Sequence, residues 1–262
     1  MPAADPESTS SATADRPVAD PLSALVARPA VSVAVARSRA AVDALLVHRV
    51  LRRRSSEVSA ESALRGVWAS CALGGSSVSL ADLRAGAIDD PAIQGALRVS
   101  AELPAVAGTW ARAPRQVLAR LHLLAAADLV EDRTVLGRPT SAAVSDRLDL
   151  LTATLAATRA PAVVVAAVVR AELLTLDAFA PASMVVANAA ARLTLVERGL
   201  DPRSLVVLEV GALERRAEEE AALAAYRAGR PDAVVAWVEH MAGAVVLGAR
   251  EAVAICEALQ RG

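Results

Sequence analysis

The sequence predicts an all-α protein. Apolar residues recur at helical spacing along most of the 262-residue chain, and Ala, Val and Leu supply most of its 55% hydrophobic content. Proline stands at several expected helix starts and glycine at several expected ends, as the two residue types prefer. No β-branched alternation persists long enough to predict a confident strand. These observations together favour a helical bundle.

The elements follow from these signals in order. Residues 1–21 are rich in Ser, Thr, Pro, Ala and Asp and offer little apolar surface, so we expect a disordered tail. Residues 22–262 are expected to form a single helical domain. Start signals include a capping box from Ser79 to Asp82 and the cap Asp90 before Pro91. The predicted helices cover residues 31–54, 56–73, 91–108, 114–129, 146–158, 161–175, 183–198, 212–227 and 231–259, with a short extended piece at 205–210.

Composition excludes several function classes. The mean hydropathy is +0.40, but the strongest apolar run, residues 160–169, is broken by Arg170 and is shorter than the roughly 20 residues of a membrane span. We therefore expect a soluble, cytoplasmic protein without membrane contact. The net charge of −1 does not favour a nucleic-acid partner. Cys71 and Cys256 are too few for a disulfide framework, no metal-ligand spacing is present, and the phosphate-binding glycine loops of nucleotide-binding folds are absent.

One segment carries most of the functional information. Residues 176–188, Leu-Asp-Ala-Phe-Ala-Pro-Ala-Ser-Met-Val-Val-Ala-Asn, resemble the signature loop of Fic-type nucleotidyl transferases. That loop is His-Pro-Phe-x-(Asp/Glu)-Gly-Asn-Gly-Arg, followed by two residues and a second Arg. The resemblance places Phe179 at the Phe, Asp177 at the catalytic His, Pro181 at the metal-holding acid, Ser183 within Gly-Asn-Gly, Val185 at the first Arg and Asn188 at the second Arg.

Three further segments resemble the same family. Residues 65–80 are similar to its N-terminal inhibitory segment, (Ser/Thr)-x-x-x-Glu-(Gly/Asn), with Ser70 at the first position and Gly74 at the place of the Glu. In Fic proteins that Glu pairs with the second Arg of the signature loop. The helix around His122 resembles the family's Leu-His helix, and residues 136–139 resemble its Pro-Gly-x-Arg loop. The similarity spans about residues 61–199 and implies a Fic-like (Fido) helical core with helical extensions at both ends.

Relative to the signature loop that it resembles, the segment lacks the side chains that bind phosphate and Mg²⁺. Val185 cannot neutralise a phosphate, and Pro181 cannot hold Mg²⁺. We therefore assign no catalytic, cofactor-binding or metal-binding residue, expect no nucleotide binding, and treat both segments as vestigial. The hypothesis is a pseudoenzyme, a non-catalytic Fic-like module that binds a protein partner or a second copy of itself. The alternatives are a divergent AMP transferase that uses Asp177 as its base, and a helical interaction protein unrelated to Fic.

Several residues receive plainer structural predictions. Phe179 should be buried, Asp177 exposed near a helix end, and Ser183 the cap of the next helix. His48, His122 and His240 are expected to be packing or surface residues, and Arg49 and Arg52 to Arg54 to lie at a helix C-terminus. Glu214 to Glu220 are expected to form a solvated, charged face. The helices at 31–51 and 234–259, the latter with Trp237, Met241, Val245 and Leu247, either present a partner surface or pack within the subunit.

Overall fold

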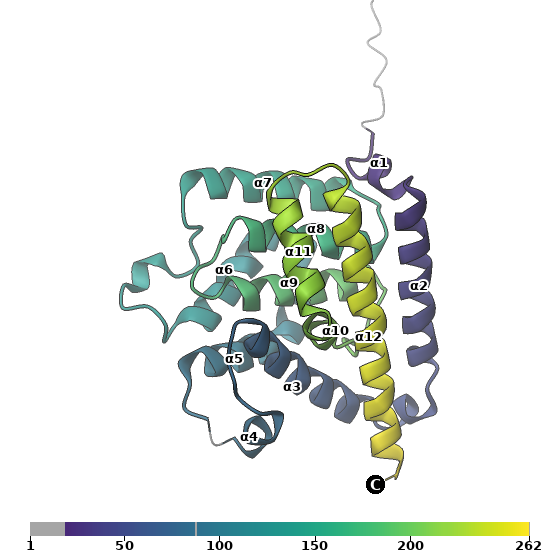
Figure 1. Cartoon of the computed structure of the whole chain (residues 1–262). Helices are drawn as coiled ribbons and strands as arrows, with labels where there is room; N and C mark the ends of the chain where they lie inside the picture. Colours follow the sequence, from purple (N-terminus) through teal and green to yellow (C-terminus); the bar gives the residue numbers. More distant parts are fainter. Residues whose placement is uncertain (1–18, 87, 262) are drawn as a thin grey trace, which may run out of the picture.

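The structure is a computed structural model that describes residues 19–86 and 88–261. These residues form helices joined by short connections and contain no strand, which confirms the predicted all-α class. Figure 1 shows the arrangement of the elements, whose bounds are as follows. They are α1 Ser23–Val26, α2 Pro29–Leu46, the 3₁₀ helix η1 Arg49–Arg52, α3 Ser55–Leu73, α4 Leu80–Ala85, α5 Pro91–Trp110, α6 Pro114–Ala126, η2 Arg133–Val135, α7 Ala142–Ala157, α8 Ala162–Thr175, α9 Ser183–Glu197, α10 Leu208–Glu214, α11 Arg216–Arg227 and α12 Ala233–Arg261.

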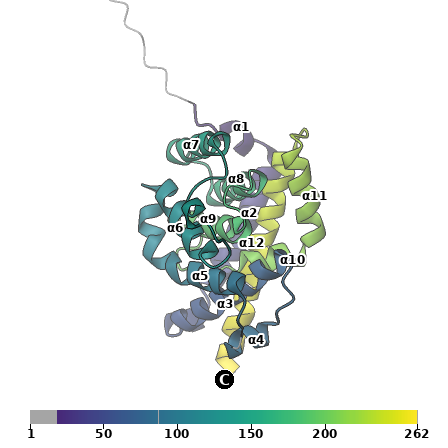
Figure 2. The ribbon, with the colours of Figure 1, turned by 90° about the vertical axis from the view of Figure 1, so that its left-hand side faces the viewer.

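The helices α8 and α9 form the centre of the molecule. Most residues of both are buried, including the run from Val163 to Ala167 in α8. A helix that is apolar all round is typical of a position enclosed by other helices. Figure 2 shows α6 and α11 on opposite sides of this central pair. The loop between α8 and α9, which carries the signature-like residues, is therefore held by the most buried part of the fold.

The helices α2 and α12 pack along one another at one side of the molecule (Figure 1). Trp237, Met241 and Val245 of α12 are fully buried in the main core. Their apolar surface is therefore already covered within the subunit. For these three residues the alternative of intramolecular packing is confirmed, whereas Leu247 is only half-buried, and a partner surface elsewhere on the two helices stays a prediction.

The predicted start signals of two helices are present. The Asp90 carboxylate accepts hydrogen bonds from the amides of Ala92 and Ile93 at 2.8 and 3.3 Å, and α5 begins at Pro91. Ser79 Oγ accepts from the amide of Asp82 at 3.1 Å and caps α4. These side chains satisfy amides that would otherwise lack partners at the helix N-termini.

Several element boundaries differ from the prediction, three of them markedly. The helix expected over residues 31–54 ends at Leu46, because His48 Nδ1 accepts from the amide of Val50 at 3.4 Å and starts η1. No extended piece spans 205–210, since α10 begins at Leu208. The helix expected from Ala212 to Arg227 is divided at Arg215 into α10 and α11.

The predicted disordered tail lies largely outside the described residues, which begin at residue 19. Within the described part, Asp20 accepts hydrogen bonds from Thr158 Oγ1 at 2.8 Å and from the amide of Arg159 at 2.6 Å. The chain is therefore attached to the helical domain before residue 22. Across residues 19–86 and 88–261, every helix is too short or too polar to cross a membrane.

Candidate functional site

The signature-like loop is anchored by the buried ring of Phe179, which is 3% exposed. The ring lies 5.3 Å from the ring of His122, centroid to centroid, and the Phe179 amide donates to Ser183 Oγ at 3.1 Å. The predicted burial of Phe179 is confirmed. The predicted role of Ser183 is wrong: Ala182 is the N-cap of α9 and Ser183 is its first residue, so the hydroxyl ties the loop to the helix instead.

His122 joins two of the resembling segments beneath this loop. Its Nδ1 accepts a hydrogen bond from the amide of Gly137 at 3.1 Å, so the Leu-His helix is attached to the 136–139 loop. Burial lowers the pKa of His122, an effect partly offset by the carbonyl of Ala180. The ring is therefore neutral near pH 7 and acts as a packing residue, as predicted.

Asp177, which the sequence resemblance places at the catalytic His of Fic proteins, is exposed at the end of α8. Its φ of 45° lies in the left-handed region, which Asp tolerates better than most residues, and its carbonyl accepts from Thr140 Oγ1 at 3.4 Å. This confirms the expected exposed Asp near a helix end. The Asp177 side chain does not line the cavity next to the loop.

That cavity, here called the loop cavity, has a volume of about 150 Å³ and lies between the end of α3, the start of α5 and the signature-like loop. The two segments that resemble the signature loop and the inhibitory segment meet in it, since Ser70 and Gly74 line it together with Pro181 and Val185. Among the described residues that line it, Asp90 carries the one carboxylate and no Arg or Lys is present. A negatively charged ligand would therefore meet no cation there.

Cys71 also lines the loop cavity, and its environment keeps its thiol unreactive. Burial, reinforced by the nearby Asp90 carboxylate, raises the pKa of Cys71 to about 11. The thiol is protonated at neutral pH and is a weak nucleophile. Within the described chain, no cluster of His, Cys, Asp and Glu has an arrangement that could hold a metal ion.

Asn188, which the resemblance places at the second Arg of the signature loop, contacts the segment that resembles the inhibitory segment. Its Nδ2 donates to Ser70 Oγ at 2.9 Å, and its Oδ1 accepts from Arg170 Nε at 2.7 Å. Both side chains of this first contact are buried. The two segments that resemble the Glu-Arg lock of Fic proteins are thus joined here by a neutral hydrogen bond.

Arg170 belongs to a buried polar cluster that sequence reasoning missed. The guanidinium is fully buried, donates to Glu219 Oε1 at 2.7 Å, and lies 5.5 Å from the ring of Trp237. Glu219 Oε2 lies 3.0 Å from His240 Nε2. The prediction of a solvated face at 214–220 is wrong for Glu219, which is 4% exposed. A charge inside an otherwise apolar run, as at Arg170, was the signal that a buried partner had to exist.

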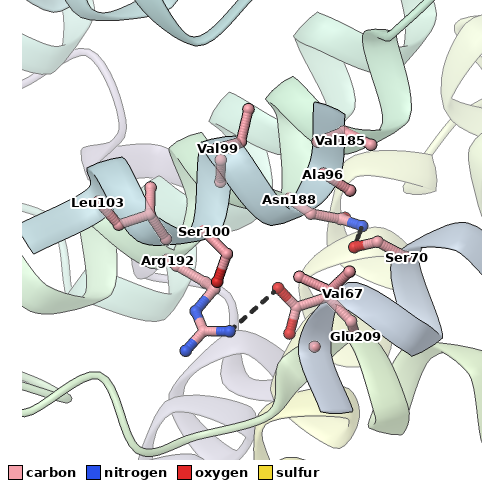
Figure 3. A pocket seen from close by; sticks show the side chains of 12 residues that line it. Val67, Ser70, Ala96, Val99, Ser100, Leu103, Val185, Asn188, Arg192 and Glu209 are labelled. Atoms are coloured by element: carbon pink, nitrogen blue, oxygen red, sulfur yellow. Dashed lines mark hydrogen bonds and ion pairs between the residues drawn. The ribbon is translucent and has the colours of Figure 1, made fainter. Parts of the chain in front are cut away.

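A second buried pair, also missed, joins α9 to α10 (Figure 3). Arg192 Nη1 lies 3.5 Å from Glu209 Oε1, and Nη2 donates to the carbonyl and the hydroxyl of Ser204 at 3.1 and 3.0 Å. Arg192 Nε and Glu209 Oε2 have no hydrogen-bond partner within the described chain. A small cavity of about 20 Å³ lies beside this pair.

The predicted arginine cluster contacts the end of another helix. Arg49 Nε donates to Gln260 Oε1 at 2.9 Å, and Arg54 pairs with Glu57 and donates to the carbonyl of Leu259. Cations near a helix C-terminus offset its partial negative charge. The cluster therefore stabilises the last turn of α12, whereas the prediction placed it at the end of its own helix.

Comparisons with solved structures identify the fold. The chain superposes on a Fic family protein from Desulfovibrio desulfuricans G20 with a TM-score of 0.73 and 19% sequence identity, covering 87% of this chain and 75% of that one. It superposes on Fic-1 (residues 134–508) from C. elegans with a TM-score of 0.67 and 16% identity, covering 87% and 73%. The sequence matches no protein-family model and no curated protein. The fold is that of Fic proteins, as the resemblance implied.

Proposed function

We propose that this protein is a non-catalytic Fic-like module that works by binding another protein. The observation that carries the proposal is the lining of the loop cavity, which presents the Asp90 carboxylate and no basic side chain among its described residues. Nucleotidyl transfer depends on cations and backbone donors that stabilise phosphate charge. A nucleotide in this cavity would instead meet a carboxylate and apolar walls.

The surroundings of Asn188 support the same proposal. The nearest buried cation, Arg170, is neutralised by Glu219 and donates to Asn188, so it is not free to bind phosphate. Asp177, the one residue that the alternative transferase hypothesis offers as a base, does not line the loop cavity. The Fic-like fold argues against the other alternative, a helical protein unrelated to Fic.

We favour an external protein over a second copy as the partner. The large apolar side chains that remain exposed among the described residues are few and lie far apart in the sequence: Val33, Val47, Leu123, Val135, Leu150 and Val234. A stable homodimer normally needs a contiguous apolar patch. Sedimentation velocity at micromolar concentration should therefore show a monomer, and a dimer would move the proposal to self-association.

The activity test uses labelled ATP with Mg²⁺ or Mn²⁺ and both the protein itself and lysate proteins as acceptors. We expect no incorporation, because the base, the metal-holding acid and both arginines of the Fic loop are replaced. Incorporation that disappears in Asp177→Ala and persists in Asp43→Ala would establish the transferase alternative. Asp43 is a suitable control because it is exposed on α2, a different helix from those flanking the loop.

A further inference from the structure

A surface groove lies where α12 passes between α2 and α11 (Figure 1). This groove, here called the arginine groove, has a volume of about 520 Å³, and ligand pockets typically have volumes of about 300–1,000 Å³. Residues of α12 from Ala236 to Arg250 form its floor, and Arg37 of α2 and residues from Arg215 to Ala222 form its sides. It shares no lining residue with the loop cavity, so it is a separate candidate site.

Two arginines of the groove are available to an anionic group. Arg37 and Arg250 are exposed, and neither side chain forms an ion pair or a hydrogen bond within the described chain. The third arginine, Arg215, is held in place, because its Nη1 donates to the carbonyl of His240 at 3.1 Å and its Nη2 pairs with Glu218. The groove therefore presents accessible cations from both α2 and α12.

The charges of the groove are spread along its length. Glu239 and Arg250 lie about 16 Å apart along α12, at the helical rise of about 1.5 Å per residue. Glu218, which pairs with Arg215, is a second negative side chain of the lining. An uninterrupted row of phosphates, as in a nucleic acid, would meet both glutamates. An extended peptide of about five residues covers the same length and can place its carboxylates opposite the arginines alone.

Apolar side chains lie beside the accessible cations. Val246 and Leu247 are half-buried in the floor of the groove. A smaller cavity of about 50 Å³ adjoins it, since both are lined by Arg37 and Val246, and this smaller cavity extends to Val33. The Val33 side chain is 59% exposed, which is unusual for a valine. A partner that supplies an apolar side chain here would cover it.

We infer that the arginine groove binds an acidic peptide segment of the protein partner, with an apolar residue next to its carboxylates. The carboxylates accept hydrogen bonds from Arg37 and Arg250, and the apolar side chain packs against Val33 and Val246. This inference rests on the proposed function, because it names the surface that binds the partner and the chemistry of that partner. It also gives the outer faces of α2 and α12 a role that their buried faces do not have.

The test is a calorimetric titration of the full-length protein with the hexapeptide Glu-Asp-Leu-Glu-Asp-Leu. We expect saturable binding with a dissociation constant below about 500 µM at low ionic strength, weakened severalfold between about 50 and 300 mM salt. Arg37→Gln and Arg250→Gln should each weaken binding by about three- to tenfold. The matched control, Arg39→Gln, removes the same charge from an exposed position of α2 outside the groove and should leave binding unchanged.

Two further arms separate the apolar contact from the charge. Val33→Ser should weaken hexapeptide binding by about two- to fivefold, because it removes an apolar contact. Its control, Val47→Ser, changes a valine that is 77% exposed and lies outside the groove, and should have no effect. The uncharged analogue Gln-Asn-Leu-Gln-Asn-Leu should bind at least about tenfold more weakly than the acidic hexapeptide.

Three results of this titration would overturn the inference. They are equal affinity for the acidic and uncharged peptides, tighter binding of a single-stranded oligothymidylate than of the hexapeptide, and variants Arg37→Gln and Arg250→Gln that bind like Arg39→Gln. Absence of saturable hexapeptide binding up to about 2 mM would overturn it as well. Each of these results leaves the proposed function standing, because that proposal fails instead on incorporation from labelled ATP.

Discussion

The two buried arginines of the central helix pair have opposite surroundings. Arg170 on α8 lies 2.7 Å from Glu219 and also donates to Asn188. Arg192 on α9 lies 3.5 Å from Glu209, its Nε has no partner within the described chain, and a cavity of about 20 Å³ lies beside the pair. Both are charges in a helical core, yet one has its main hydrogen bonds satisfied within the protein and the other does not.

The difference indicates different roles for the two pairs. The short contacts around Arg170 connect α8, α9 and α11 and fix their relative positions. In this cluster, Nδ1 of His240 has no hydrogen-bond partner within the described chain. A satisfied network of this kind is specific and rigid, and breaking it leaves a charge unpaired. The pair at Arg192 is longer, and its Nε and Glu209 Oε2 have no partner among the described residues beside a cavity that has room for about one water molecule.

The largest predicted effect comes from removing each arginine in turn. Arg170→Met should lower the free energy of unfolding by about 3–5 kcal/mol, because it leaves Glu219 buried beside uncharged groups. Arg192→Met should lower the free energy of unfolding by less, about 1–3 kcal/mol, because the distance between Arg192 and Glu209 is longer and the pair lies beside cavities that admit water. Urea denaturation measures both. Equal losses, or a larger loss for Arg192→Met, would contradict the distinction between the two pairs.

The second prediction concerns pH and the carboxyl of Glu219. Burial alone would raise the pKa of Glu219, but the charge of Arg170 and the hydrogen bonds from His240 and Arg170 outweigh it and lower the pKa from 4.5 to about 2. Because the folded value lies below the unfolded one, the stabilisation is complete above about pH 4.5 and is lost as the pH falls toward 2.

Glu219→Gln should therefore reduce the loss of folding stability at low pH. Between about pH 5 and pH 2 the unmodified protein should lose on the order of 2–3 kcal/mol more stability than the variant, measured by chemical denaturation at stepped pH. Glu218→Gln is the control, because the side chain of this neighbour on α11 is 61% exposed. This variant should lose as much stability at low pH as the unmodified protein. An identical pH dependence in all three proteins would show that Glu219 is not the group responsible.

A smaller and more local effect is expected from Gly66→Ala. The new Cβ would lie 2.6 Å from Arg192 Nη1 and 3.2 Å from Glu209 Oε2, so the guanidinium must move, at a cost of about 1–3 kcal/mol. Gly108→Ala on α5 meets nothing within 4 Å and should stabilise the protein by up to about 1 kcal/mol. Thermal unfolding compares them, and a neutral Gly66→Ala would show that the position of Arg192 is not fixed by this contact.

Sequence reasoning found the fold and the helix–loop–helix around Phe179 because both depend on local patterns. Apolar spacing and caps such as Asp90 and Ser79 decide where helices begin, and a single phenylalanine in a loop between apolar helices predicts its own burial. Phe179 and Asp177 were placed correctly for this reason. Boundaries failed where a side chain competed with the helix, as His48 does when it accepts from the amide of Val50.

Contacts between distant segments were out of reach of the same reasoning. Glu219 lies in a charged stretch that is typical of a solvated face, and its burial follows only from the position of α11 over Arg170. Asn188 and Ser70 are 118 residues apart, and nothing in the pattern around either indicates their hydrogen bond. Ser183 is a residue type that often caps a helix, but its hydroxyl accepts a hydrogen bond from the amide of Phe179 instead.

The most direct test of the proposed function is a calorimetric titration with Mg-ATP. We expect no saturable binding at millimolar concentrations, because the described lining of the loop cavity offers a carboxylate and no cation. The variant Ala92→Trp, which fills the mouth of this cavity, and the control Ala101→Trp on the exposed part of α5 locate any signal. Saturable binding that is lost in Ala92→Trp and kept in Ala101→Trp would contradict the account.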